Sequence, residues 1–308
     1  MSAPLGYNRP LFIVAFDHRA SFKSDLFGIE ATPTPKEVAR ISDAKRVIFE
    51  GVKLAVADGV PPVSAGVLVD EEFAAGIARE ATAEGLRLAM SVEKSGQPEF
   101  DFEYGADFGD HIEAFDPTFA KVLVRYNPDG DSALNRRQLS RLSELSIWLL
   151  AHQRRLLFEL LIPAEPGQLE DVGGNVDRYD VEIRPDLTVR TMLEVQAAGV
   201  EVDVWKIQGL DRRQDCERVS AQARAGGRDA VACIVLGHGA SEAKVEHWLR
   251  EAAGVTGYVG FAVGRTIWSD ALKAWLAEEV DRPRAARLIA DKYLRQIEVY
   301  EGALTPRR

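Results

Sequence analysis

Apolar residues along the chain gather in eight short runs, separated by longer stretches with a helical period of apolar and polar positions. The runs are predicted strands at residues 11–18, 64–71, 86–93, 119–126, 155–163, 202–209, 230–239 and 258–266. They are almost continuously apolar, as parallel strands buried on both faces are. The stretches 34–59 and 135–155 between them have the pattern of amphipathic helices. Strand and helix alternate eight times, which predicts one α/β domain over residues 1–308, a (β/α)8 TIM barrel.

A doubly wound sheet is the alternative architecture. No strand is followed by a G-x-G-x-x-G turn, so the nucleotide-binding version of that fold has no support. Residues 163–187 are too many for a tight connection and predict an elaborated loop after the fifth strand, on the face where barrel active sites lie. Residues 282–308 predict an extra C-terminal helix that could cap the barrel, cover the active-site mouth or form a subunit contact.

Composition narrows the function classes. The 308-residue chain has a formal net charge of −10, which argues against nucleic-acid binding. No apolar run reaches the roughly 20 residues that span a bilayer, and residues 1–10 lack the pattern of a signal peptide. Cys216 and Cys233 are too few for a disulfide framework. We therefore expect a cytoplasmic protein with neither a membrane nor a nucleic-acid partner.

Four predicted strands carry a charge on an otherwise apolar face. Side chains alternate along a strand, so each run divides into two faces. One face is apolar and suits contact with the helices around the barrel. The other face bears a charged residue near the carboxyl end of strands one, four, five and six: Asp17, Lys121, Glu159 and Lys206. In a barrel this second face points inward, so the four groups should meet in one small volume. Arg19 and Arg125 share the inward parity.

Two lysines and two carboxylates could form a mutually neutralising network, but such a network gives uncertain stability for its desolvation cost. A reaction centre needs these same groups. A lysine beside a second cation in a desolvated site can attack a carbonyl as a free amine, and the iminium that forms makes the neighbouring C–C bond breakable. Carboxylates then move the protons. Lys206 is the predicted nucleophile, and Lys121, Glu159 and Asp17 are its predicted catalytic partners.

The seventh and eighth runs end in glycines followed by helices. Residues 235–241 include Gly237, His238 and Gly239, and residues 261–268 include Gly264 and Arg265. Exposed backbone amides, a helix N-terminus and a guanidinium suit a phosphate group, and the loops after strands seven and eight are the usual phosphate position in barrels. We expect these five residues to bind a phosphate.

These motifs resemble a known family. "AFDHRASF", "KVLVRY", "FELLIP", "DVWKIQG", "VLGHGAS" and "FAVGRTIW" are similar to class I (Schiff-base) aldolases of the tagatose-1,6-bisphosphate aldolase type. The resemblance is closer to the aldolase-like domain associated with 5-dehydro-2-deoxygluconokinase in bacterial inositol catabolism, although the kinase part has no counterpart here. It covers residues 11–300 and implies a metal-independent, cofactor-free homo-oligomer that cleaves a ketose phosphate into dihydroxyacetone phosphate and an aldehyde.

The resemblance also implies residue roles. Lys206 matches the Schiff-base lysine, Glu159 the proton-handling carboxylate, Lys121 the lysine that stabilises the carbinolamine, and Asp17 an aspartate near the substrate hydroxyls. His238 is a departure from the family pattern, because relatives tend to have a small residue at this position. The substrates compared are 5-dehydro-2-deoxygluconate 6-phosphate, which we favour, tagatose 1,6-bisphosphate and sulfofructose 1-phosphate. All carry a second anion, for which Arg19, Arg125 and Arg184 are candidates; Arg136 and Arg137 fit plain surface charge.

Three other classes fit less well. A metal-dependent aldolase needs clustered ligands, and the five histidines show no ligand spacing; strand parity points His18 toward the helices unless the first strand has already ended. A non-catalytic sugar-phosphate-binding barrel would keep Arg265 and the glycines but would not need Lys206, Lys121 and Glu159 together. An oxidoreductase lacks a dinucleotide motif.

Overall fold

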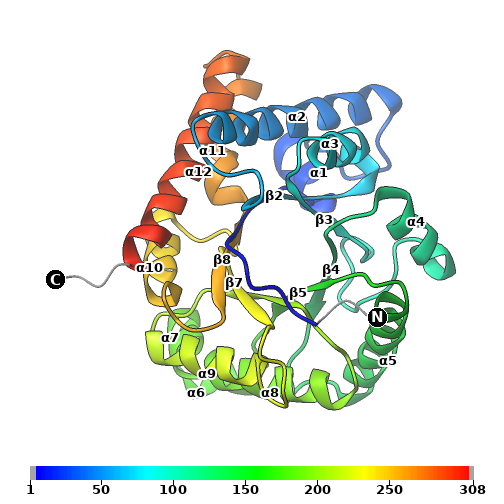
Figure 1. Ribbon diagram of the computed structural model, residues 1–308, viewed down its shortest axis with the longest axis vertical. Coiled ribbons are helices and arrows are strands. Elements are labelled where there is room, and N and C mark those ends of the chain that lie inside the picture. The colour runs from blue at the N-terminus through cyan, green and yellow to red at the C-terminus, as the bar shows by residue number, and fades with distance from the viewer. Residues whose placement is uncertain (1–4, 305–308) are drawn as a thin grey trace.

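The computed structural model describes residues 5–304, which form a closed barrel of eight parallel strands in sequential order, as predicted (Figure 1). The strands are β1 Leu11–Ala15, β2 Ala65–Val69, β3 Arg87–Ser91, β4 Phe119–Arg125, β5 Leu156–Leu161, β6 Val204–Gln208, β7 Ala232–Leu236 and β8 Tyr258–Val263. The α-helices are α1 Ala20–Phe27, α2 Pro35–Ala57, α3 Glu71–Ala83, α4 Phe108–Phe115, α5 Ser132–Ala151, α6 Pro166–Asp171, α7 Val176–Glu182, α8 Arg184–Ala197, α9 Arg213–Ala223, α10 Glu242–Ala252, α11 Arg265–Leu276 and α12 Arg282–Leu304. A 3-10 turn, η1 Gly105–Asp107, precedes α4.

The barrel has two apolar layers, as the alternation along the strands predicts. One layer lies between strands and helices and includes Phe12, Phe158 and Trp205. The other fills the barrel interior and includes Leu157 and Val204. Each inward strand position above this filling is therefore free to carry a functional side chain at the carboxyl end of the barrel.

The segment after β5 is more regular than the predicted loop. Residues 163–187 contain α6, α7 and the start of α8. Proline lies in the first turn of α6 and of α8, where its missing N–H costs nothing, and Asn175 caps α7 through the Arg178 amide. The predicted elaborated loop is thus built largely of short helices. The sequence did not reveal α6 and α7 because they contain too few turns to show a helical period.

The C-terminal helix α12 belongs to the outer ring. It packs along α2 and against α10 and α11, and the Tyr293 hydroxyl donates to the Phe12 carbonyl at 2.6 Å (Figure 1). The predicted helix extends to residue 308, but residues 305–308 lie outside the described part. None of the helices in residues 5–304 combines the length and the apolar character needed to cross a membrane.

Candidate active site

A cavity of about 350 Å³ opens at the carboxyl ends of the strands. Asp17, Lys121, Glu159 and Lys206 all line it, so the barrel brings the four predicted catalytic residues together. Their side chains are at least nine-tenths buried. In the β5–β6 register, Glu159 lies directly beside Lys206. The inward parity assigned to these strands is therefore confirmed.

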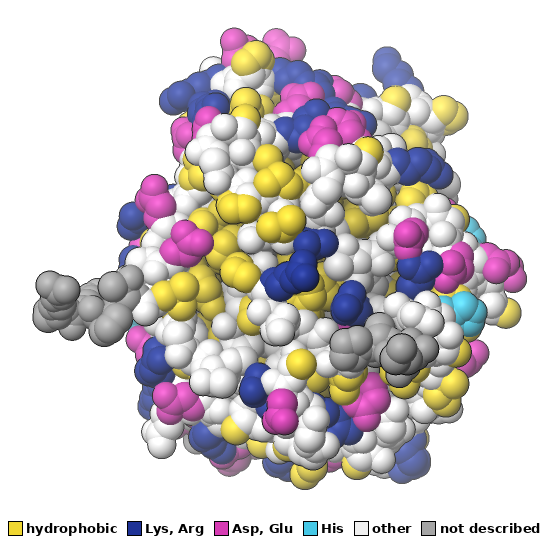
Figure 2. Space-filling model, in the orientation of Figure 1, with side chains coloured by type: hydrophobic (Ala, Val, Ile, Leu, Met, Phe, Trp, Pro, Cys, Tyr) yellow, Lys and Arg dark blue, Asp and Glu magenta, His cyan; other side chains and the backbone are white. Residues whose placement is uncertain are grey.

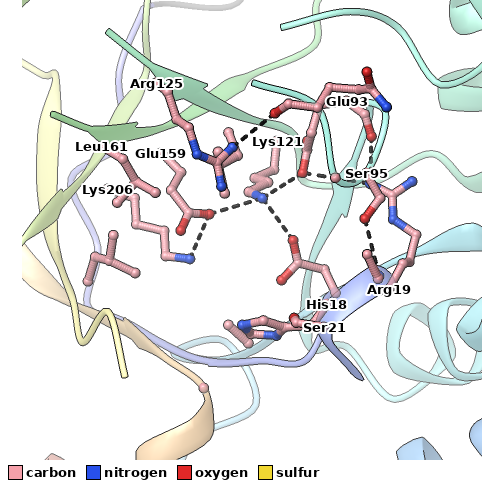
Figure 3. Close-up of a pocket in the computed structure, with 18 of the residues that line it drawn as sticks. His18, Arg19, Ser21, Glu93, Ser95, Lys121, Arg125, Glu159, Leu161 and Lys206 are labelled. Atoms are coloured by element: carbon pink, nitrogen blue, oxygen red, sulfur yellow. Dashed lines mark hydrogen bonds and ion pairs between the residues drawn. The ribbon is translucent and has the colours of Figure 1, made fainter. Parts of the chain in front are cut away.

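Lys121 lies at the centre of the charge cluster (Figure 3). Its Nζ is 2.8 Å from Asp17 Oδ2, 2.8 Å from Glu93 Oε1 and 3.0 Å from Glu159 Oε2. Burial alone would lower the pKa of Lys121, but the three carboxylates outweigh it and raise that pKa. Lys121 is thus held as an ammonium ion, a poor nucleophile but a fixed positive charge.

Lys206 has a different environment. Its Nζ lies 2.9 Å from Glu159 Oε2, the oxygen that also faces Lys121. Burial would raise the pKa of Glu159, yet the charges of Lys121 and Lys206 hold it below its usual value. One ionised carboxylate oxygen therefore bridges the two lysines and can exchange a proton with a group bound at Lys206.

Asp17 completes the cluster from the segment after β1. Burial acts to raise its pKa, but Lys121 contributes the largest opposing effect, and the pKa is lowered strongly. The first strand ends at Ala15, so the parity argument that turned His18 toward the helices no longer applies. His18 lines the cavity instead, and burial lowers its pKa to about 4, only partly opposed by Asp17. Its imidazole packs edge-on against Trp268.

Glu93 is a cavity residue that the sequence reasoning missed. It follows β3, accepts from Lys121 and has a second oxygen, Oε2, that is buried without a hydrogen-bond partner among residues 5–304. Burial raises the pKa of Glu93 against the charges of Lys121 and Arg19. Parity in the third strand could have found it, because Glu93 shares the inward face with Ser91 and Ala89.

Arg19 lies in the cavity wall, where its two terminal guanidinium nitrogens are already engaged and its Nε is buried without a partner among residues 5–304. Its guanidinium donates to Glu103 Oε2 at 2.7 Å and to the Glu93 carbonyl at 2.5 Å. This geometry fits a residue that positions the loop after β3. Arg125 is different: it is exposed at the rim, donates to the Gln97 carbonyl at 3.2 Å, and forms no ion pair within residues 5–304. Arg125 is therefore better placed than Arg19 to bind an anion.

Arg184 is the first residue of α8, not part of a loop. It is buried and donates to the carbonyls of Gln208 and Gly209, at 3.2 and 2.8 Å. Its positive charge thus fastens the end of β6, the strand of Lys206, and it does not line the cavity.

The predicted phosphate-binding residues lie at the ends of β7 and β8. His238, Gly239, Gly264 and Arg265 line the cavity, and Arg265 is exposed with no ion pair in the described chain. Burial lowers the pKa of His238, helped by the Arg265 charge. Gly237 does not line the cavity; a β-carbon there would meet Val245 and Val263, so this glycine serves packing.

Gly239 makes room for the Arg265 guanidinium. It has φ +73°, and a β-carbon on it would lie 2.7 Å from an Arg265 nitrogen. We expect Gly239→Ala to push the guanidinium aside and to weaken binding of inorganic phosphate at this site about tenfold, measured by calorimetry. Gly167→Ala in α6, where a β-carbon meets nothing, is the matched control. Equal affinity of Gly239→Ala and Gly167→Ala would contradict this role.

Other reactive groups lie apart from the cavity. Within residues 5–304, no cluster of three or more His, Cys, Asp or Glu residues could hold a metal ion. Cys216 and Cys233 are buried and free.

A family model described as "Uncharacterized protein conserved in bacteria (DUF2090)" matches residues 6–303. The chain belongs to this family. No curated protein is similar enough to count as a match. The family description names no activity.

Solved structures share the fold. A fructose-bisphosphate aldolase from Plasmodium falciparum, solved with TRAP and a small-molecule inhibitor, superposes with a TM-score of 0.67 at 13% identity, covering 100% of this chain and 99% of that one. Cgl0159 from Corynebacterium glutamicum superposes with a TM-score of 0.57 at 18% identity, covering 94% and 88%. At these identities the comparisons establish the TIM-barrel fold.

Proposed function

We propose that this protein is a class I aldolase that cleaves a ketose phosphate into dihydroxyacetone phosphate and an aldehyde through a Schiff base on Lys206. The observation that carries the proposal is the asymmetry of the two lysines. Three carboxylates hold Lys121 as an ammonium ion, whereas Lys206 forms an ion pair only with Glu159 among residues 5–304. One lysine thus supplies fixed charge, and the other is available for attack.

The proposed reaction begins with attack of the Lys206 amine on the substrate ketone. The carbinolamine loses its hydroxyl as water, with the proton supplied through Glu159, and Lys121 stabilises the negative charge that develops on oxygen. In the iminium that results, a carboxylate takes the proton of the substrate hydroxyl; Asp17 is the group we assign. The C–C bond breaks, its electrons form an enamine on Lys206, and the aldehyde leaves. Protonation and hydrolysis release dihydroxyacetone phosphate.

The order of residues around the barrel gives the substrate a direction. Arg265 and Gly239 follow β8 and β7, and we assign the phosphate of the dihydroxyacetone half to them. Lys206 and Glu159 come next, on β6 and β5. Arg125 on β4 lies beyond them at the rim, on the side of the departing aldehyde. The assignment to aldolases is also supported by the shared fold of the fructose-bisphosphate aldolase.

Among the ketose phosphates, we favour 5-dehydro-2-deoxygluconate 6-phosphate, whose aldehyde half carries a carboxylate. The preference rests on the motif resemblance, and tagatose 1,6-bisphosphate and sulfofructose 1-phosphate are the alternatives. We also expect a homo-oligomer that uses no cofactor.

Borohydride trapping tests the proposal. The protein is incubated with dihydroxyacetone phosphate, reduced and digested, and the added mass is located by mass spectrometry. We expect one stable adduct on Lys206. An adduct on Lys121 would reverse the roles of the lysines. Absence of any adduct, with phosphate binding intact, would favour a non-catalytic sugar-phosphate-binding barrel.

Arg125 tests the aldehyde side separately. We expect Arg125→Met to raise KM for the cleaved ketose phosphate about tenfold or more, because a charge-assisted contact to its second anion is lost. Trapping with dihydroxyacetone phosphate, which lacks that half, should be unchanged. Arg136→Met, which removes an exposed guanidinium from α5, is the matched control. An unchanged KM would remove Arg125 from the site.

A further inference from the structure

A second cavity, of about 320 Å³, lies at the opposite end of the barrel, where the strands begin. The segment 5–9 crosses this end in front of the barrel (Figure 1). It is fastened by the Gly6 amide, which donates to Asp203 Oδ1 at 2.7 Å, and by the Tyr7 amide, which donates to the Ala230 carbonyl at 2.8 Å. Figure 2 shows Lys and Arg side chains gathered near the centre of this face.

Three arginines from separate parts of the chain line this cavity. Arg9 precedes β1, Arg87 begins β3 and Arg155 precedes β5. None of them forms an ion pair with any carboxylate of residues 5–304, and Arg155 Nε is buried without a hydrogen-bond partner there. The adjacent Arg154, by contrast, binds Glu113 at 2.8 Å. Three guanidinium groups around one cavity repel one another unless an anion lies between them.

Hydroxyl groups add to the donors. Tyr7 and Thr118 line the same cavity. The Tyr7 hydroxyl is buried without a partner in the described chain, and Thr118 Oγ1 accepts from the Leu88 amide, which leaves its own proton to donate. The nearby carboxylate of Asp203 faces inward to the backbone, with one oxygen on the Gly6 amide and the other, at 2.8 Å, on the Leu156 amide.

The geometry points to a second anion site in this cavity, which binds the phosphate group of a small metabolite. A tetrahedral phosphate offers acceptors in several directions, and guanidinium groups match it with paired hydrogen bonds. The volume is at the lower end of small-molecule sites, so the ligand is a compact phosphate ester or phosphate itself. The apolar filling of the barrel separates this site from Lys206, and the inference is therefore independent of the aldolase proposal.

Calorimetric titration of the full chain with inorganic phosphate tests the inference. We expect two independent classes of site in the wild-type protein. Arg265→Met should remove the class at the carboxyl end. Arg155→Met and Arg87→Met should each weaken phosphate binding in the second cavity at least about tenfold. Arg155→Lys should recover only part of this loss, because an ammonium group lacks the paired N–H donors of a guanidinium group. Arg284→Met, an exposed arginine on α12, is the matched control for net charge.

Three results would overturn the inference. One is a single class of phosphate site that Arg265→Met abolishes. Another is equal weakening by Arg284→Met and Arg155→Met, which would indicate general surface charge. The third is malonate binding as tight as phosphate, which would remove the phosphate assignment. Thermal unfolding confirms that each variant is folded; if Arg155→Met is not, Arg9→Met, which truncates an exposed side chain, replaces it.

Discussion

Lys206→Met should abolish aldol cleavage and borohydride trapping while leaving the barrel folded. The proposed nucleophile is lost, and Lys121 cannot replace it, because three carboxylates hold Lys121 protonated. We expect kcat to fall at least about 10³-fold, as for removal of a covalent nucleophile. Met keeps the length of the side chain, and Glu159 retains its contact with Lys121 at 3.0 Å, so the fold should tolerate the change.

The measurement combines steady-state cleavage with mass mapping of the reduced adduct. Lys36→Met, which removes an exposed lysine at the start of α2, controls for nonspecific reduction of surface amines. The Lys206→Met variant should still bind inorganic phosphate with unchanged affinity, because Arg265 and Gly239 remain. A residual adduct of wild-type yield in Lys206→Met would show that another residue is the nucleophile.

The sequence was sufficient to predict the barrel and most of the charged residues that line its carboxyl-end cavity. Eight apolar runs predicted eight parallel strands, and parity within four of them placed Asp17, Lys121, Glu159 and Lys206 together. Both predictions rest on the strand period of two, which is strict wherever strands are buried on both faces. The same rule extends only to the end of each strand, and β1 ends at Ala15. Beyond that end Asp17 keeps its predicted inward position, while His18, which parity turned toward the helices only if the strand continued, also lines the cavity.

Functional or buried residues that lie outside the strands or at their first position were harder to predict, because the strand period of two does not place them. Lys45 is completely buried in α2, where it pairs with Asp70 and donates to the His18 carbonyl at 3.0 Å. The helical period places Lys45 on the apolar face of α2, between Ile41 and Phe49, but it does not indicate the partner Asp70. The arginines of the second cavity come from positions before β1, at the start of β3 and before β5. Such positions meet only through barrel closure, which a linear pattern does not display.

Removal of Lys121 should cause the largest loss of stability. Lys121→Met leaves Asp17, Glu93 and Glu159 buried around an uncharged side chain. Breaking a buried ion pair from one side costs about 3–5 kcal/mol, and here three carboxylates lose their shared partner. We expect the free energy of unfolding near pH 7, measured by urea denaturation, to fall by about that amount, with cleavage activity also lost.

The pH dependence of the free energy of unfolding shows whether the ion pairs of Lys121 are responsible for the lost stability. In the wild-type protein Asp17 and Glu159 have lowered pKa values, so their contribution is present above the unfolded pKa of about 4 and is lost as pH falls below it. Glu93 has a raised pKa, so its burial lowers the free energy of unfolding at neutral pH. This loss is relieved as the pH falls and Glu93 takes up a proton. The raised pKa of Lys121 contributes stability that persists up to the unfolded lysine pKa of about 10 and is lost above the folded pKa.

Without Lys121, burial should raise the pKa values of Asp17 and Glu93 above their unfolded values, whereas Glu159 keeps Lys206 at 2.9 Å. The folded state then binds more protons than the unfolded state, so Lys121→Met should become more stable on acidification from pH 8 to pH 5, while the wild-type protein changes little. Adding Glu93→Gln to Lys121→Met removes one of the unpaired charges and should restore part of the stability at pH 8. If both variants followed the wild-type pH profile, Lys121 would not control the charge of the surrounding carboxylates, because water would solvate them well enough without it. The assignment of Lys121 as the fixed cation beside Lys206 would then be wrong.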